Sequence, residues 1–110
     1  MLNLLFVCSQ NKLRSPTAEE VYSDTPGVET RSAGLNSNSQ SPISLDDVEW
    51  ADLIFVMEQT HRIKLQKAFG KSVGKKRIVV LNIPDQYDYM QPELIESIRE
   101  KVDPVLARYR

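Results

Sequence analysis

Four short runs rich in apolar residues are separated by longer and more polar segments. Two of them, Leu4–Val7 and Ala51–Met57, are almost continuously apolar, which is typical of strands buried on both faces of a parallel sheet. A third run, Val28–Ala33, alternates apolar and polar residues, and the fourth is Ile78–Ile83. We therefore expect four β-strands.

Segments with helical spacing of apolar residues lie between and after these strands. We expect helices over residues 16 to about 23 and 58–70, the second ending at Gly70 and burying Leu65, Ala68 and Phe69. A last helix should follow Gln91, with Pro104 kinking or interrupting it. This order of elements predicts an α/β fold of three layers around a four-stranded parallel sheet.

The middle of the chain is short and polar. Residues 36–44 are rich in Ser and Asn and should form a loop. The pattern Ser44-x-x-Asp47 predicts a capped helix of one or two turns, ending near Trp50. So short a connection could leave one sheet face thinly covered, which predicts a shallow, open site or a dimer contact. We expect Trp50 to plug the core beneath that gap.

Composition narrows the functional classes. The 110 residues suit a single domain over 1–110. A net charge of -1 predicts neither a nucleic-acid nor a membrane partner. The chain has no apolar run of membrane-spanning length and no basic N-terminal start, so we expect a cytoplasmic protein. One cysteine cannot form an internal disulfide. The sequence has no His/Cys cluster with metal-ligand spacing, so we expect no metal and no other cofactor.

The strongest chemical signal is the spacing Cys8-x5-Arg14-Ser15. Cys8 ends the first predicted strand, and Ser15-Pro16 is typical of a capped helix start. A tight loop between strand and helix turns backbone N–H groups into a concavity that suits phosphate. Arg14 can bind two phosphate oxygens at once, and the same positive field favours the thiolate of Cys8. The pattern predicts an activated sulfur facing a bound phosphorus.

This stretch resembles the phosphate loop of the low-molecular-weight protein tyrosine phosphatases, Cys-x-Gly-Asn-x-Cys-Arg-Ser-Pro. The family residues that this chain keeps are Cys8, Asn11, Arg14, Ser15 and Pro16. The resemblance implies the strand order 2-1-3-4, with the phosphate loop after the first strand. It also implies hydrolysis of phosphate monoesters, protein phosphotyrosine first among them, through a cysteinyl-phosphate intermediate.

Two positions depart from the family pattern. Gln10 replaces a glycine, so it must adopt a compatible conformation or accept strain. Leu13 replaces a second cysteine, so Cys8 cannot be protected by an intramolecular disulfide, and its oxidation should be harder to reverse.

Further segments also match the family. Ser32-Ala33-Gly34 and Ala51–Met57 resemble two of its strand ends. The resemblance assigns Asn11, Ser15 and Ser32 to a hydrogen-bond network that supports the loop. The lone histidine, His61, is expected on an exposed helix surface and is not favoured as a general base.

A general acid should lie on the loop after the fourth strand, which emerges at the same sheet edge as Cys8. Asp85 is the preferred candidate, because Tyr87 follows it as the aromatic residue follows the family's acid, and Asp88 before Tyr89 competes. The tyrosines could form an apolar wall against an aryl leaving group. The expected substrate-binding residues are Ser9, Gln10, Asn11, Lys12, Leu13, Tyr87 and Tyr89.

The expected partners are a phosphorylated protein or a small aryl phosphate, with inorganic phosphate as product. Three rival functions remain. An arsenate reductase would need more thiols than Cys8 supplies, and a phosphoryl carrier must preserve phosphocysteine, which a water-activating Asp85 opposes. A non-catalytic phosphate-binding module is made plausible by Gln10, by the shortened middle and by Gln86, which replaces the proline of the family's Asp-Pro-Tyr/Phe segment.

Overall fold

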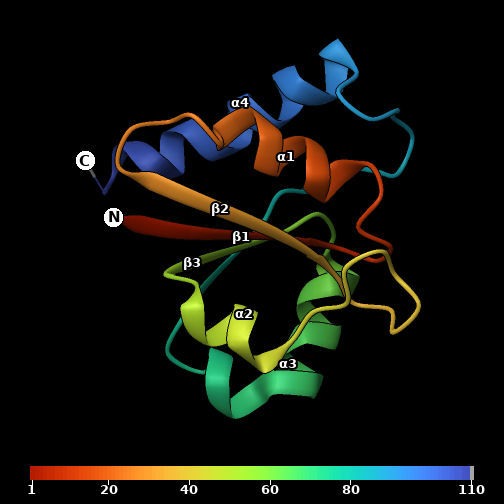
Figure 1. Cartoon of the computed structure of the whole chain (residues 1–110), viewed down its shortest axis with the longest axis vertical. Coiled ribbons are helices and arrows are strands. Elements are labelled where there is room, and N and C mark those ends of the chain that lie inside the picture. The colour runs from red at the N-terminus through yellow and green to blue at the C-terminus, as the bar shows by residue number, and fades with distance from the viewer. Residues whose placement is uncertain (110) are drawn as a thin grey trace.

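The computed structural model describes residues 1–109 and contains a four-stranded parallel sheet (Figure 1). Its strands are β1 (Leu2–Cys8), β2 (Val28–Gly34), β3 (Leu53–Val56) and β4 (Arg77–Val80). They lie in the order β2-β1-β3-β4, and Cys8 at the end of β1 is in register with Gly34. The expected sheet and its strand order are confirmed.

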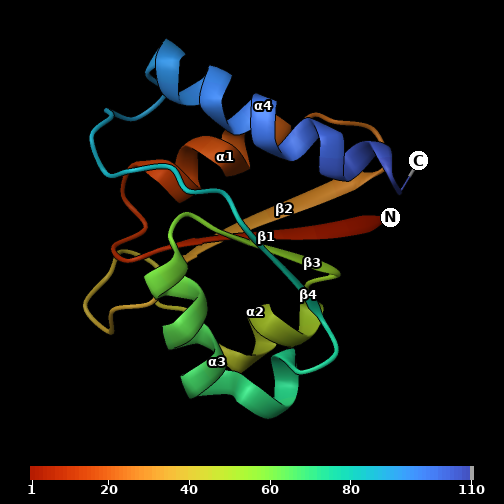
Figure 2. The same cartoon turned by 180° about the vertical axis from the view of Figure 1, so that it is seen from behind.

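Helices cover both faces of this sheet. α1 (Arg14–Tyr22) and α4 (Pro92–Ala107) pack on one face, while α2 (Leu45–Trp50) and α3 (Gln59–Val73) pack on the other (Figures 1 and 2). The three-layer α/β architecture is therefore confirmed. No helix within residues 1–109 is both long enough and apolar enough to cross a membrane.

The core consists of one hydrophobic cluster on each side of the sheet. Along β1, Leu4 and Phe6 belong to the cluster under α1 and α4, whereas Leu5 and Val7 belong to the cluster under α2 and α3. Successive residues of a strand point to opposite faces, and helices cover both faces of the sheet, so all four side chains are fully buried. The strand that carries Cys8 is thus held from both sides.

Two helices extend beyond their predicted ends. α3 continues past Gly70 to Val73 and has a kink at Phe69. Ala68, which was expected on the buried face, is exposed. Pro104 lies inside α4 without ending it. The prediction of a stop at Gly70 was wrong, because packing of Val73 in the core favours a further turn.

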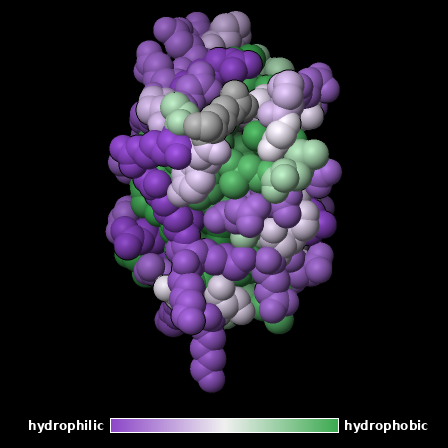
Figure 3. All heavy atoms as spheres, turned by 90° about the vertical axis from the view of Figure 1, so that its left-hand side faces the viewer, coloured by the Kyte–Doolittle hydropathy of each residue, from purple (hydrophilic) through white to green (hydrophobic). Residues whose placement is uncertain are grey.

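The short middle region does not bury Trp50 as fully as expected. Ser44 caps α2 reciprocally with Asp47, as predicted. The fully buried side chain is Val48, however, while Trp50 is half-buried beneath the guanidinium of Arg31, 4.3 Å from its ring centre. The side of the molecule at the start of β1 is mainly polar, with a smaller hydrophobic area across its middle (Figure 3).

Candidate active site

The loop from Cys8 to Arg14 is shaped by the segment that follows β2. Three successive carbonyl oxygens, of Cys8, Ser9 and Gln10, accept hydrogen bonds at 2.9, 3.0 and 3.2 Å. The donors, in the same order, are the backbone N–H groups of Leu35, Asn36 and Gln40. These bonds turn three carbonyl groups of the loop away from its concave side.

The opposite sides of the same peptides form a cradle of donors. In a trans peptide the N–H points away from the C=O, so the N–H groups of Ser9, Gln10 and Asn11 are directed into the loop. The N–H of Asn11 indeed donates to Sγ of Cys8 at 3.2 Å. Several convergent N–H groups make an anion-binding concavity. We call this arrangement the amide cradle.

Backbone strain falls on Asn11 rather than on Gln10. Asn11 has a φ of 54°, and asparagine tolerates this left-handed conformation better than most residues. Within residues 1–109, Gln10 is not among the residues with positive φ. The loss of the family's glycine at position 10 therefore costs no left-handed strain.

A glycine at the end of β2 permits the close approach of the supporting segment. A Cβ atom at Gly34 would lie 2.8 Å from the carbonyl oxygen of Ser9 and 2.5 Å from the side chain of Ser39. Both distances are too short for real contacts, so only glycine fits without displacement. Gly34 thus belongs to the support of the amide cradle.

Cys8 sits at the base of the cradle and contacts a buried serine. Its Sγ lies 2.9 Å from Oγ of Ser15, which in turn lies 3.0 Å from Oδ1 of Asn11. The hydroxyl of Ser15 therefore does not cap α1, contrary to prediction. The helix begins one residue earlier, at Arg14, and its N-cap is Leu13.

The third residue of the expected network lies apart from the other two. The hydroxyl of Ser32 donates to Glu19 of α1. Asn11 and Ser15 contact each other and Cys8, as the resemblance implied. Ser32 instead joins β2 to α1, and the backbone after β2 supplies the remaining support of the loop.

Arg14 is buried, donates to two acceptors and forms a longer ion pair with Asp85. Its guanidinium donates to Oε2 of Glu58 at 2.5 Å and to the carbonyl oxygen of Ile83 at 2.7 Å, and Nε lies 3.8 Å from Oδ1 of Asp85. The hydrogen bond from Arg14 lowers the pKa of Glu58 below its ordinary value. These contacts orient the arginine from segments that follow β3 and β4.

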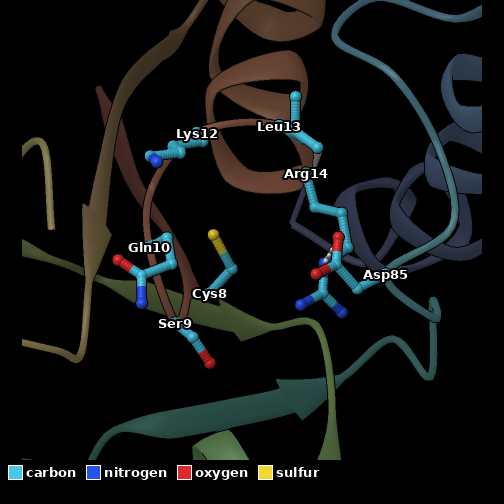
Figure 4. A pocket seen from close by; sticks show the side chains of 7 residues that line it. All are labelled: Cys8, Ser9, Gln10, Lys12, Leu13, Arg14 and Asp85. Atoms are coloured by element: carbon cyan, nitrogen blue, oxygen red, sulfur yellow. Dashed lines mark ion pairs between the residues drawn. The ribbon is translucent and has the colours of Figure 1, made fainter.

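A small pocket of about 100 Å³ opens above the sulfur. Its lining within residues 1–109 consists of Cys8, Ser9, Gln10, Lys12, Leu13, Arg14 and Asp85. In Figure 4, Asp85 lies beside Arg14, across the pocket from Gln10 and Lys12. Besides Cys8 itself, five residues of the loop and the preferred candidate for the acid thus line the pocket at one thiol.

Other predicted site residues lie outside that lining. Tyr87 packs against the core and Tyr89 is half exposed, so neither forms the expected wall in this structure. Asp88 is exposed, and its N–H donates to the side chain of Gln91 before α4. Asn11 is buried and is not among the lining residues, although its backbone N–H donates to the sulfur.

His61 is the functional candidate that sequence reasoning missed. It was expected on an exposed surface, yet its side chain is only 2 % exposed and lies 3.0 Å from Ser9. Burial is the main cause that lowers the pKa of His61 to about 4. The sequence feature that could have revealed His61 is its position just after a buried strand, in Glu58-x-x-His61. A helix that starts there begins at the same sheet edge as Cys8. Within residues 1–109, no group of three His, Cys, Asp or Glu side chains could hold a metal ion.

Solved structures share this fold along nearly the whole chain. A low-molecular-weight protein tyrosine phosphatase from Streptococcus pyogenes is 18% identical, with a TM-score of 0.81 over 100% of this chain and 94% of that one. The tyrosine phosphatase Wzb from Escherichia coli K30, solved in complex with phosphate, is 17% identical, with a TM-score of 0.79 over 98% of this chain and 99% of that one. The YwlE arginine phosphatase from Geobacillus stearothermophilus is 21% identical, with a TM-score of 0.69 over 99% of this chain and 90% of that one.

The chain therefore has the fold of the low-molecular-weight protein tyrosine phosphatases, as the resemblance implied. No protein-family model matches the sequence, and no curated protein matches it significantly. At these identities the likeness concerns the fold, so the chemistry has to be argued from the residues of the site.

Proposed function

We propose that this protein hydrolyses phosphate monoesters through a phosphocysteine intermediate on Cys8. The observation that carries the proposal is the meeting of a nucleophile, an anion cradle and an acid in one pocket. Cys8, Arg14 and Asp85 all line it, and one N–H of the amide cradle, that of Asn11, donates to the sulfur. A pocket of about 100 Å³ is large enough for a phosphoryl group but for little of the molecule that carries it.

In the first step the thiolate of Cys8 attacks phosphorus. The S–P bond forms as the bond from phosphorus to the leaving oxygen breaks, and Asp85 gives its proton to that oxygen. Negative charge on the equatorial oxygens is stabilised by Arg14 and by the N–H groups of the cradle. Positioned positive charge and hydrogen-bond donors thus act together with nucleophilic catalysis by Cys8.

In the second step water releases the phosphoryl group. Asp85, now a carboxylate, takes a proton from water as the water oxygen attacks phosphorus and the S–P bond breaks. The products are inorganic phosphate and the thiolate of Cys8. The same carboxyl group thus acts first as acid and then as base, which its place at the pocket and its exposure to solvent support.

The proposed substrates are phosphorylated protein side chains, with phosphotyrosine as the first to test. Some structural relatives are named tyrosine phosphatases, and others are named arginine phosphatases. One observation favours the second class: Tyr87 and Tyr89 do not line the pocket, so an aryl group has no aromatic wall there. Phosphoarginine is therefore the competing substrate.

The decisive experiment is hydrolysis of para-nitrophenyl phosphate by the wild type and by Cys8→Ser. We expect turnover in the wild type and none in the variant, which should still bind inorganic phosphate. A stoichiometric burst without turnover would indicate a phosphoryl carrier, and phosphate binding without reaction would indicate a binding module. Phosphotyrosine and phosphoarginine peptides of one sequence, compared by kcat/KM, then separate the two substrate classes.

A further inference from the structure

The N-cap residue of α3 and the first turn of that helix contact the two ends of the loop between Cys8 and Arg14. Nε2 of His61 lies 3.0 Å from Oγ of Ser9, the residue that follows Cys8. Oε2 of Glu58 lies 2.5 Å from the guanidinium of Arg14, at the other end. The backbone N–H of Glu58 donates to Nδ1 of His61 at 3.1 Å, so the two contacts are joined.

The hydrogen bonds of His61 define which nitrogen carries its proton. Nδ1 accepts the N–H of Glu58 and therefore holds a lone pair, so the proton of the neutral ring is on Nε2. Its nearest acceptor is the hydroxyl oxygen of Ser9, since Oε2 of Glu58 is 4.0 Å away. A pKa of about 4 keeps the ring neutral at pH 7. His61 is thus a donor to Ser9.

Ser9 is consequently held from two sides. Its side chain accepts from His61, and its carbonyl oxygen accepts from the N–H of Asn36 at 3.0 Å. Because the peptide between Ser9 and Gln10 is planar, fixing that carbonyl group also fixes the direction of the Gln10 N–H. This N–H belongs to the amide cradle, so the contact from α3 reaches the position where a phosphoryl oxygen would bind.

We propose that His61 is a positioning residue for phosphoryl transfer, acting through its hydrogen bond to Ser9. His61 does not line the pocket within residues 1–109, so its effect on the reacting group passes through Ser9. This inference rests on the proposed function, because it concerns the geometry of the same phosphate-binding loop. It gives the lone histidine a role other than general base catalysis.

Two substitutions separate the two hydrogen bonds of the ring. In His61→Asn, the side-chain oxygen can take the place of Nδ1 and accept the N–H of Glu58, but the side chain is too short to reach Ser9. In His61→Gln, the amide NH₂ can take the place of Nε2 and donate to Ser9. Activity should follow the bond to Ser9, whereas a purely structural role would make activity follow stability.

The test is kcat/KM for para-nitrophenyl phosphate in the wild type, Ser9→Ala, His61→Asn, the double variant and His61→Gln, with urea unfolding of each. We expect about a fivefold to tenfold loss for either single variant. The double variant should lose no more than one single variant, because both remove the same bond. His61→Gln should stay within about twofold of the wild type.

The proposal is overturned if the two losses multiply, if Ser9→Ala is fully active, or if activity falls only in proportion to the folded fraction. Absence of turnover in the wild type would defeat the proposed function and this inference together. Normal wild-type turnover with unaffected variants would defeat this inference alone. The ¹⁵N shifts of the His61 ring, measured on the unliganded protein, test the Nε2–H assignment whatever the activity; a proton on Nδ1 would also overturn the inference.

Discussion

Oγ of Ser15 lies 2.9 Å from Sγ of Cys8, and both side chains are buried at the start of α1. The same oxygen lies 3.0 Å from Oδ1 of Asn11. In this structure the single hydroxyl proton of Ser15 is donated to Oδ1 of Asn11. A thiolate can only accept, so we expect this proton to turn toward the sulfur when Cys8 is ionised. We therefore expect Ser15 to be the side-chain donor to the thiolate of Cys8, beside the backbone N–H of Asn11.

Ser15→Ala should therefore slow the reactions of the Cys8 thiolate. Loss of a hydrogen bond to a charged group corresponds to about a tenfold effect or more. We expect alkylation of Cys8 by iodoacetamide near neutral pH to slow by about that factor, with a similar fall in kcat. Ser23→Ala, at an exposed serine after α1, is the matched control and should change neither rate. An unchanged alkylation rate in Ser15→Ala would show that Ser15 does not stabilise the thiolate of Cys8.

Asp85→Asn should slow turnover much more than Asp88→Asn. Asp85 lies at the pocket beside Arg14, whereas Asp88 is exposed and outside the lining. General acid–base catalysis contributes about 10²–10⁴-fold, so we expect a loss in kcat of at least about a hundredfold for Asp85→Asn. Asp88→Asn should stay within about twofold.

The leaving group provides the control for this assignment. A general acid matters more when the leaving oxygen is more basic, so the loss in Asp85→Asn should grow from para-nitrophenyl phosphate to phenyl phosphate. Equal and mild effects of the two substitutions on both substrates would exclude Asp85 as the acid.

Local patterns were sufficient for the strand and the loop that carry Cys8. The apolar run Leu4–Val7 is buried on both faces, and the spacing from Cys8 to Arg14 does form a loop between strand and helix. The topology then brought Asp85 to the same edge, because the carboxyl ends of parallel strands meet there. These predictions depend on short-range sequence and on one rule of chain direction.

Contacts between distant segments could not be predicted in the same way. His61 and Ser9 are 52 residues apart, and Glu58 reaches Arg14 across 44. Burial of His61 depends on how α3 packs against the loop, which no local pattern specifies. Ser32 shows the converse: its position matched the family, yet its hydroxyl turned to Glu19 on a neighbouring helix. Partners of polar side chains follow from packing, and so they need the structure.

Gly34→Ala should destabilise the protein and impair the site together. The new methyl group would lie 2.8 Å from the Ser9 carbonyl oxygen and 2.5 Å from Ser39, so the supporting segment would have to move. Overpacking of this kind costs about 1–3 kcal/mol, measurable by urea unfolding, and we expect phosphate binding to weaken as well.

Gly70→Ala is the matched control for that substitution. A Cβ atom at this exposed position of α3 meets nothing within 4 Å. Alanine there should stabilise the protein by about 0.5–1 kcal/mol and leave activity unchanged, because glycine is the weaker helix former. Similar effects of the two substitutions would show that the close approach at Gly34 does not constrain the loop.

His61 should make the protein less stable as the pH falls below neutral. Its pKa is about 4 in the folded state, against 6.5 for the free side chain. Above pH 6.5 the ring is neutral in both states, and its contribution to stability is complete. Between pH 6.5 and 4 the unfolded state binds the proton while the folded state does not, so each pH unit costs about 1.4 kcal/mol of the free energy of unfolding.

Urea unfolding at pH 7.5 and pH 5.0 measures this loss, which should be about 2 kcal/mol in the wild type. His61 is the only histidine, and the hydrogen bond from Arg14 lowers the pKa of the neighbouring Glu58 below its ordinary value. His61→Asn should therefore show almost no difference between the two pH values, whatever its absolute stability. Parallel losses in the wild type and in His61→Asn would mean that another group is responsible, and that the ring is not held neutral by its burial beside Ser9.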